Sequence, residues 1–280
     1  MLYAHSGRYR APSSFGSRSP DRRRSDRGHA GFRQNTTQIA SHRYINQVAT
    51  AIAPVKQAAS QHQFADFGLD QRIVANVLSH GYGDPTPIQD QIIPHFLAGK
   101  DVVGIANTGT GKTAAFLLPL LNKVLLDNKQ GVLIVAPTRE LAAQIRDELT
   151  KFAKGLPISM SLCVGGVGIQ PQLRAVARNP HFVIGTPGRI KDLVNRGALK
   201  TASYNNVILD EVDRMLDIGF VHDIRFLIER MPAVRQSGFF SATMTNQVRP
   251  IMQSFLHDPV TISVETVKTS THIHQDIIRI

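Results

Sequence analysis

The sequence predicts an α/β protein whose parallel β-sheet is covered by helices on both faces. Three observations predict this class. From Phe64 onward, short apolar runs alternate with segments of helical periodicity. The runs are apolar throughout, as expected for strands buried on both faces of a parallel sheet. The polar motifs of this part of the chain follow directly after apolar runs, and ligands gather at the carboxyl ends of parallel strands. This alternation of strands and helices is typical of the α/β class.

The expected elements can be placed on the chain from these patterns. Strands are expected at Asp101–Ala106, Val132–Ala136, Phe182–Gly185, Val207–Leu209, Gly238–Phe240 and Thr261–Val264. Helices are expected at Gln71–Ser79, Ile88–Leu97, Lys112–Leu125, Arg139–Phe152, Pro171–Arg178, Gly188–Asn195, Val221–Glu229 and Asn246–Phe255. With 280 residues, 42% of them hydrophobic, the chain can bury a substantial core.

The first 60 residues differ from the rest in composition. They contain ten Lys or Arg and two acids, a net charge of +8, whereas the remaining 220 residues contain 22 Lys or Arg and 19 acids. Residues 1–35 are rich in Ser, Arg and Gly and cannot bury enough surface to offset the entropy of ordering, so disorder is expected. Residues 36–60 are interpreted as a linker of marginal helicity, interrupted by Pro54. Such a basic tail attracts polyanions through counterion release.

Composition also indicates where in the cell the protein is located. The single cysteine, Cys163, excludes a disulfide framework within the chain and is interpreted as a small buried side chain. No apolar stretch approaches the roughly 20 residues that cross a bilayer, and no secretory signal is apparent. An organelle transit peptide is the alternative for the Arg- and Ser-rich start, but Asp21 and Asp26 favour a solvated tail. A cytoplasmic location is therefore expected.

A glycine-rich segment, Ala106-Asn107-Thr108-Gly109-Thr110-Gly111-Lys112-Thr113, follows the first strand and opens a helix. Small residues let backbone N–H groups approach phosphates, and a helix N-terminus adds partial positive charge. In this pattern Lys112 reaches the β- and γ-phosphates and the Thr113 hydroxyl is a ligand of Mg²⁺. Ala106 stands where the usual loop pattern begins with Gly.

The same segment also fits a dinucleotide-binding turn, Gly109-Thr110-Gly111-Lys112-Thr113-Ala114. That turn requires an acidic residue about 20 residues further on, at the end of the second strand, to bind a ribose. The second expected strand ends in Ala136-Pro137-Thr138 instead. Phosphate binding is therefore favoured over a Rossmann oxidoreductase.

Asp210-Glu211-Val212-Asp213 follows the apolar run Asn206-Val207-Ile208-Leu209. A carboxylate at the tip of a buried strand can hold Mg²⁺, and its neighbour can orient or deprotonate an attacking water. Asp210 suits the first role and Glu211 the second. A solvated acidic helix start is the alternative. The glycine-rich segment upstream, Ala106 to Thr113, is called the phosphate loop below, and its presence favours the catalytic interpretation.

In order and spacing, these motifs resemble those of the first domain of DEAD-box RNA helicases, over about residues 62–280. The further matches are Phe64-Ala-Asp-Phe67-Gly-Leu69, Gly81 to Gln89, Pro137-Thr138-Arg139-Glu140-Leu141-Ala142, Gly165-Gly166, Thr186-Pro187-Gly188-Arg189 and Ser241-Ala242-Thr243. Two positions depart from the family pattern, because Asn107 stands for its usual Gln and Val212 for its usual Ala. Both changes keep the character of the side chain.

The resemblance implies a role for each motif. It implies ATP and Mg²⁺ as ligands, with Lys112, Asp210 and Glu211 as catalytic residues. Gln89 resembles the glutamine that pairs with adenine, and Phe64 the aromatic residue that packs against the base; an exposed helix residue and a core residue are the respective alternatives. The implied contacts to the RNA backbone, which carry no sequence information, are Pro137, Thr138, Arg139, Gly165, Gly166, Thr186 and Arg189.

Helix capping is a compatible second role for Thr138 and Thr186. Ser241 and Thr243 resemble the motif that links the nucleotide site to strand separation, and they are expected to hydrogen-bond Asp213.

Composition predicts a disordered basic tail and linker over 1–60. The resemblance implies a RecA-like ATP-binding domain over 61–270 and, over 271–280, the start of a linker to a second RecA-like domain. Such helicases bind ATP and RNA between two domains, and the second domain supplies arginines that stabilise charge on the phosphates. In related reactions such arginines raise turnover on the order of 10³–10⁵-fold. This chain, expected to be a monomer, is therefore expected to bind nucleotide weakly, hydrolyse it barely and not unwind RNA. A non-catalytic RNA-binding protein driven by the tail is the alternative function.

Overall fold

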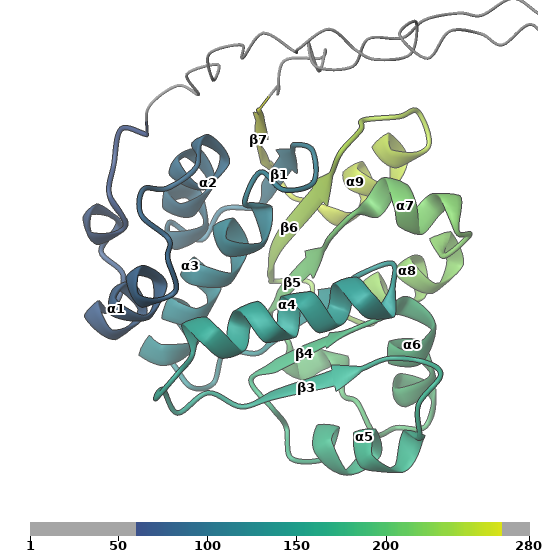
Figure 1. Ribbon diagram of the computed structural model, residues 1–280. Helices are drawn as coiled ribbons and strands as arrows, with labels where there is room; N and C mark the ends of the chain where they lie inside the picture. The colour runs from purple at the N-terminus through teal and green to yellow at the C-terminus, as the bar shows by residue number, and fades with distance from the viewer. Residues whose placement is uncertain (1–59, 265–280) are drawn as a thin grey trace, which may run out of the picture. The chain divides into compact units, whose positions relative to one another are not determined.

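The computed structural model describes residues 60–264 (Figure 1). The tail and linker predicted for residues 1–60, apart from Ser60, and the linker predicted for 271–280 lie outside the described residues. Within residues 60–264, no helix combines the length and the apolar character that crossing a bilayer requires.

Seven parallel strands form one sheet with the order β3-β4-β2-β5-β6-β1-β7 (Figure 1). The predicted parallel α/β sheet is thus confirmed, and each of the six predicted strands is present with ends shifted by no more than two residues. The strands are β1 (Val102–Ile105), β2 (Val132–Val135), β3 (Met160–Cys163), β4 (Phe182–Gly185), β5 (Asn206–Leu209), β6 (Gln236–Ser241) and β7 (Val260–Ser263).

Strand β3 was not predicted from the sequence. Its four residues, Met-Ser-Leu-Cys, include no β-branched or aromatic side chain, so the local preference for a strand is weak. It lies at the edge of the sheet, where Met160 and Leu162 are only half-buried and Ser161 and Cys163 are buried. Pairing with β4, rather than local preference, therefore defines this strand.

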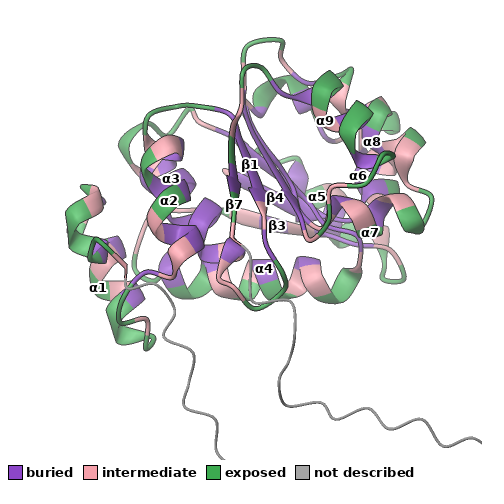
Figure 2. Cartoon of the chain, turned by 90° about the horizontal axis from the view of Figure 1, so that it is seen from above, coloured by how far each residue is buried: buried purple, intermediate pink, exposed green. Residues whose placement is uncertain are grey.

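Helices cover both faces of the sheet (Figure 2). One face is covered by η2 (Phe64–Phe67), α1 (Gln71–Ser79), α2 (Pro87–Leu97), α3 (Lys112–Leu126) and α4 (Arg139–Phe152). The other is covered by α5 (Ile169–Val176), α6 (Pro187–Asn195), α7 (Val212–Asp217), α8 (Val221–Ile228) and α9 (Val248–Phe255). The eight predicted helices are present within two residues at each end, and the short α7 is additional. A 3₁₀ turn, η3 (Thr201–Ser203), follows α6.

Strand β2 shows why the runs are apolar throughout. Val132 and Ile134 pack into the cluster under α1–α4, and Leu133 and Val135 into the cluster under α5–α9. All four side chains have no exposed surface. At about 1.5–3 kcal/mol for each fully buried aliphatic side chain, this strand is driven to the centre of the sheet from both sides.

The parallel sheet places the polar motifs at one edge, because every strand ends there. The segments after β1, β5 and β6 carry, respectively, the phosphate loop, the acidic motif Asp210-Glu211-Val212-Asp213, and Ser241-Ala242-Thr243. These three strands are consecutive in the sheet, in the order β5-β6-β1. The segments after β2, β3 and β4 carry the residues predicted to contact RNA, and these strands are neighbours too. The strand order thus separates the two predicted functions into adjacent halves of the edge.

Candidate active site

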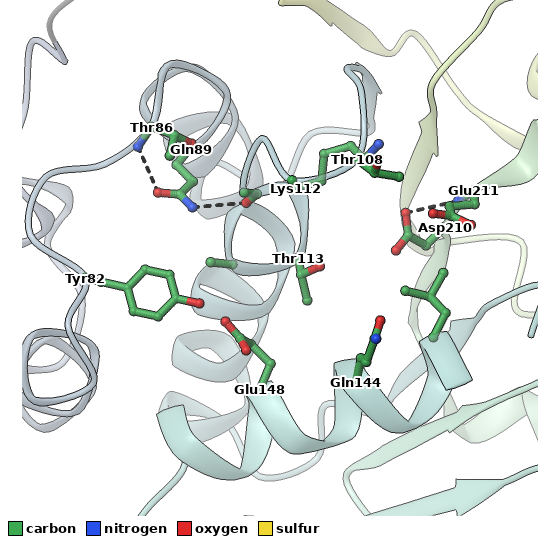
Figure 3. A pocket seen from close by; sticks show the side chains of 14 residues that line it. Tyr82, Thr86, Gln89, Thr108, Lys112, Thr113, Gln144, Glu148, Asp210 and Glu211 are labelled. Atoms are coloured by element: carbon green, nitrogen blue, oxygen red, sulfur yellow. Dashed lines mark hydrogen bonds between the residues drawn. The ribbon is translucent and has the colours of Figure 1, made fainter. Parts of the chain in front are cut away.

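A pocket of about 550 Å³ lies at this edge of the sheet, over the start of α3 (Figure 3). It joins residues from the phosphate loop, the acidic motif and the segment around Gln89, which are far apart in the sequence. The predicted residues that line it are Gln89, Thr108, Gly109, Gly111, Lys112, Thr113, Asp210 and Glu211. The structure therefore assembles most of the predicted nucleotide site in one cavity.

The phosphate loop depends on two glycines with positive φ, Gly109 at +81° and Gly111 at +95°. Gly111 is the residue before the first turn of α3. A side chain at this position would also collide with the Gln89 amide. The loop thus turns the chain so that the N-terminus of α3 faces the pocket, as anion binding by a helix N-terminus requires.

Lys112 is buried, with 7% of its surface exposed, and its ammonium group donates to the carbonyl of Ala106 across the loop. Thr110 Oγ1 donates to the carbonyl of Asn107 at 2.8 Å, a second bond within the loop. The Ala106 N–H donates to the carbonyl of Ser241 at 3.1 Å, which ties the loop to the end of β6. These bonds hold the Lys112 charge over the loop, beside the hydroxyl of Thr113 in the pocket.

Asp210 is almost completely buried, with 2% of its surface exposed. Burial raises the pKa of its carboxyl to about 6; the nearby Lys112 opposes this rise, and Glu211 adds to it. Asp210 Oδ1 accepts a hydrogen bond from the Glu211 N–H at 3.0 Å. A buried carboxylate without an ion-pair partner in residues 60–264 is a group that a bound cation stabilises.

Glu211 has a left-handed backbone conformation, with φ 51° and ψ 54°. Such a conformation costs a non-glycine residue of order 1–3 kcal/mol and is frequent at functional sites. It turns the chain from β5 into α7 and leaves the Glu211 side chain at the pocket wall (Figure 3). Arg214 Nη1 donates to Glu211 Oε2 at 3.2 Å and holds the carboxylate from the first turn of α7.

The donor set fits a magnesium ion that also has phosphate ligands. Thr113 offers a hydroxyl oxygen and Asp210 a buried carboxylate, and both line the same pocket. Residues 60–264 contain no group of three or more His, Cys, Asp or Glu side chains that could hold a metal ion. Mg²⁺ commonly binds through one or two protein oxygens plus substrate phosphates and waters, so two protein oxygens suffice.

Gln89 connects α2 to the phosphate loop. Its side chain accepts from the Thr86 N–H at 2.9 Å and donates to the carbonyl of Gly111 at 3.0 Å. Only 1% of Gln89 is exposed, so it is not an ordinary surface residue of the helix. Figure 3 shows its amide between these two partners at the rim of the pocket. The segment around Gln89 is therefore fixed relative to the loop that it adjoins.

Phe64 lies apart from this pocket. It is buried in the core, with 1% of its surface exposed, and lines a separate cavity of about 230 Å³ with Val74 and Leu78. The aromatic side chain that lines the pocket over the start of α3 is Tyr82, which packs edge-on against Phe152 with ring centroids 5.4 Å apart. The role of Phe64 against a base stays a prediction.

Sequence reasoning missed the wall that α4 contributes. Leu141, Gln144 and Glu148 line the pocket, and the last two point into it in Figure 3. Their spacing of three and four residues places them on one face of α4. That periodicity was the available signal, but it could not reveal that this polar face turns toward α3.

Asp213 links the acidic motif to the end of β6. Its Oδ2 atom accepts from the Thr243 N–H and hydroxyl, both at 2.9 Å, and from the Ala242 N–H at 3.2 Å. The Thr243 contact is the one expected from the sequence. Ser241 contacts a different group, because its buried hydroxyl donates to the carbonyl of Thr243 at 2.8 Å.

The segments predicted to contact RNA meet around the Gly165-Gly166 turn. Arg139 Nη1 donates to the carbonyl of Gly165 at 3.4 Å, and Arg189 Nη2 to the carbonyl of Val167 at 3.3 Å. Gly166 has φ +75°, and a side chain there would collide with the Arg139 guanidinium. Two arginines from different helices thus hold one exposed turn. Val167, half exposed directly after Gly166, was not singled out by the sequence.

The two threonines of these segments differ in their capping roles. Thr138 Oγ1 accepts from the Leu141 N–H at 3.2 Å and caps α4, which confirms the second role predicted for it. Thr186 precedes α6 but its side chain makes no capping bond. Pro137, also predicted to contact RNA, is buried in the turn before Thr138.

A family model described as DEAD/DEAH box helicase matches residues 86–251. The chain belongs to this family. It is 43% identical over 220 residues to ATP-dependent RNA helicase CshA of Listeria monocytogenes, covering 78% of this chain and 42% of the relative. It is 44% identical over 204 residues to DEAD-box ATP-dependent RNA helicase CshA of Bacillus cereus, covering 72% and 39%. The chain thus spans about two fifths of the length of these curated relatives.

Solved structures agree with the family and the fold. A DEAD box protein from the hyperthermophile Methanococcus jannaschii superposes with a TM-score of 0.70 at 35% identity, covering 72% of this chain and 56% of that one. A hypothetical ATP-dependent RNA helicase from Sulfolobus tokodaii superposes with a TM-score of 0.66 at 32% identity, covering 70% and 57%. The predicted DEAD-box resemblance and the predicted RecA-like α/β fold are both confirmed.

For a DEAD/DEAH box helicase, the motif that names the family is Asp210-Glu211-Val212-Asp213 in this chain. The three acidic residues of this motif have different surroundings. Asp210 is buried beside Lys112, Glu211 lines the pocket, and Asp213 faces Thr243. Val212, the departure from the family pattern, is fully buried among the side chains under α5–α9, so the additional methyl groups point away from the pocket.

Proposed function

We propose that this chain is the basic tail and the first, ATP-binding domain of an ATP-dependent RNA helicase that works as a cytoplasmic monomer. The observation that carries the proposal is the pocket in which Lys112 and Thr113 meet Asp210 and Glu211. A lysine and a threonine at a helix N-terminus and two acids at the end of β5 have no common structural purpose, whereas a magnesium-bound triphosphate uses all four.

Residues on different sides of the pocket contact different parts of the nucleotide. The N–H groups at the start of α3 and the Lys112 ammonium bind the phosphates. Gln89 reads adenine through its amide, which offers both a donor and an acceptor. The oxygen of that amide has a second lone pair and its nitrogen a second hydrogen beyond the bonds to Thr86 and Gly111. Gln89 can therefore contact the base without releasing the phosphate loop.

Hydrolysis requires an activated water and neutralised phosphates. Thr113 and Asp210 would hold Mg²⁺, which neutralises charge on the phosphate oxygens when bound. Glu211 orients or deprotonates the attacking water, and its bond to Arg214 sets the direction of the carboxylate. The bond from Thr243 to Asp213 connects this acidic motif to β6 and transmits changes at the phosphates along the edge of the sheet.

RNA binding is assigned to the other half of the same edge. The Thr138 and Thr186 hydroxyls, the Gly165 and Gly166 N–H groups and the two arginines suit sugar and phosphate oxygens, and such contacts do not discriminate sequence. A second RecA-like domain is proposed to close over both halves, since the curated relatives are more than twice the length of the matched region. Efficient hydrolysis and unwinding are assigned to that two-domain protein, and only weak binding and little turnover to this chain.

A non-catalytic RNA-binding protein remains the competing proposal, because the first 60 residues carry a net charge of +8. The two proposals differ in whether RNA affinity depends on ATP. Deleting residues 1–59 separates them. An RNA affinity that survives the deletion and rises with ATP supports the helicase, and an affinity that disappears with the tail supports the alternative.

The nucleotide site is tested by calorimetric titration with a non-hydrolysable ATP analogue, with and without Mg²⁺. Lys112→Ala should abolish binding, whereas Glu211→Gln should leave binding intact and, in the two-domain protein, lower phosphate release by about 10²–10⁴-fold. Lys151→Ala, an exposed lysine on α4, is the control for loss of a positive charge. Normal binding of the analogue by Lys112→Ala would show that the phosphates lie elsewhere.

A further inference from the structure

A second basic surface lies on α6 and α8, which pack against each other on the face of the sheet opposite α1–α4. Residues 187–203 and 221–230 contain six Lys or Arg and three acids. Residues 60–264 as a whole contain 20 Lys or Arg and 17 acids, so the rest of the described chain is neutral. The basic residues of this α6–α8 surface are Arg189, Lys191, Arg196, Lys200, Arg225 and Arg230.

Two cations of this surface lie over the ring of Phe226. The guanidinium carbon of Arg230 lies 3.6 Å from the centroid of the Phe226 ring, and the Lys191 ammonium lies 5.4 Å from it. Arg230 Nη1 also donates to the carbonyl of Phe226 at 3.1 Å. The aromatic ring and the carbonyl together fix the guanidinium in place, so that Phe226 acts as a positioning residue for Arg230.

The Arg230 charge is available to an external ligand. Its side chain is 45% exposed, and its ion-pair partner in residues 60–264 is the exposed Glu229 at 3.9 Å, a contact too long and too solvated to neutralise it. Arg225 is exposed without any such pair. Lys191, in contrast, is paired with Asp223 at 2.7 Å and contributes less.

The chemistry of this surface matches single-stranded RNA. Arginine planes stack on unpaired bases, and clustered positive charges bind the phosphate chain by releasing counterions. An acidic polypeptide would use the charges alone, whereas unpaired bases can also stack on the exposed guanidinium held over the Phe226 ring. Arg189, in the first turn of α6, donates to the carbonyl of Val167 beside the Gly165-Gly166 turn, so α6 reaches the residues proposed to contact RNA.

We propose that the α6–α8 surface is an accessory site for single-stranded RNA, which extends from Arg189 to Arg230. This inference rests on the proposed function, since it prolongs the RNA path assigned there. It predicts that longer RNA gains affinity from residues that a short RNA does not reach.

The test compares RNA of about six and about 20 unpaired nucleotides, lengths that bracket the site of a single small domain. Binding of each to the full chain is measured by fluorescence anisotropy over a range of salt. The double variant Arg225→Gln/Arg230→Gln should weaken the long RNA about 3–10-fold and lower the slope of log K against log[salt] by about 1.4, at about 0.7 for each lost phosphate contact. The short RNA should bind as before. The control is Arg146→Gln/Lys154→Gln, on and just after α4.

The outcomes separate this inference from the proposed function. If the double variant and the control bind the long RNA equally well, the accessory site is refuted, whatever the short RNA does. If Arg139→Gln leaves the affinity for the short RNA unchanged, the proposed backbone site fails instead. Binding of poly-glutamate by wild type but not by the double variant, with the long RNA bound equally by both, would identify the surface as a site for acidic polypeptides and would also refute the inference.

Stacking of an RNA base on Arg230 is measured separately, by fluorescence quenching. A series of long RNAs with 2-aminopurine moved along the strand should show quenching at one or two positions. Arg230→Lys keeps the positive charge but removes the planar guanidinium. The slope of log K against log[salt] should therefore be retained and the quenching lost. Phe226→Leu should lose quenching as well. Undiminished quenching in Arg230→Lys would refute stacking at this residue.

Discussion

Thr243 donates two hydrogen bonds to one oxygen of Asp213, from its N–H and from its hydroxyl, both 2.9 Å long. The Ala242 N–H adds a third at 3.2 Å. A single carboxylate oxygen of the acidic motif thus fastens the end of β5 to the end of β6. Because the same turn after β6 lies beside the phosphate loop, through the bond from the Ala106 N–H to the carbonyl of Ser241, the three strand ends form one connected unit.

Thr243→Val tests this connection, because it removes the hydroxyl and keeps the shape. Loss of a hydrogen bond to a charged group should lower the free energy of unfolding by about 1.5–3 kcal/mol, and the exposed site places the value toward the lower end. Urea denaturation measures it. Nucleotide affinity should be unchanged, since Thr243 does not line the pocket. Ser254→Ala, which removes a hydroxyl bonded only within α9, is the control.

Gln89→Glu should weaken nucleotide binding through the phosphate loop. The replacement can still accept from the Thr86 N–H, but it places a carboxylate oxygen against the carbonyl of Gly111, where the amide now donates. Two acceptors facing each other in a buried site should cost about 1–3 kcal/mol, or roughly 5–150-fold in affinity for an ATP analogue. Calorimetry measures the change.

Gln144→Glu introduces the same carboxylate into the wall of the pocket, away from the loop carbonyl, and serves as the matched control for Gln89→Glu. An equal loss of affinity in both variants would attribute the effect to added negative charge, and not to the lost bond with Gly111.

Gly166→Ala should lower the affinity for short RNA, because the new methyl group displaces the Arg139 guanidinium. The positive φ adds a strain of about 1–2 kcal/mol that has nothing to do with RNA. Gly155→Ala isolates that strain, since Gly155 has nearly the same φ, +73°, and open space where the methyl group would lie. Both variants should lose similar stability in urea, and only Gly166→Ala should lose RNA affinity. Similar RNA affinities would remove Arg139 from the proposed contacts.

Cys163 should make the folded protein sensitive to alkaline pH. Its side chain is fully buried, and burial raises the pKa of the thiol from 9.0 to about 11. The unfolded thiol therefore loses its proton first. The stability that the neutral thiol contributes is present below pH 9 and is lost as the pH rises toward 11, up to about 2–3 kcal/mol. Urea denaturation of wild type and Cys163→Ala at pH 8 and pH 10.5 measures the difference, which should shrink in favour of the alanine variant. A difference independent of pH would contradict the assignment.

The sequence by itself determined the fold class and the positions of most elements. Residues apolar on both faces, such as those of β2, can only be buried between two layers, and Gly111 and Thr138 mark the starts of α3 and α4. The chemistry of Lys112 and Asp210 also follows from residue type and from position after a strand. These features are local, so a pattern of neighbouring residues suffices to predict them.

Only the tertiary structure decided which of these features meet. The strand order places β5 beside β6 and β3 beside β4, and no local pattern contains that order. It decided that Tyr82 and α4 line the pocket over the start of α3 while Phe64 lies in the core, and that the Ser241 hydroxyl donates to the carbonyl of Thr243 and not to Asp213. It also placed Arg230 over the ring of Phe226 and α6 against α8. Such contacts join residues distant in sequence, and they depend on the direction of each side chain once the helices have packed onto the sheet.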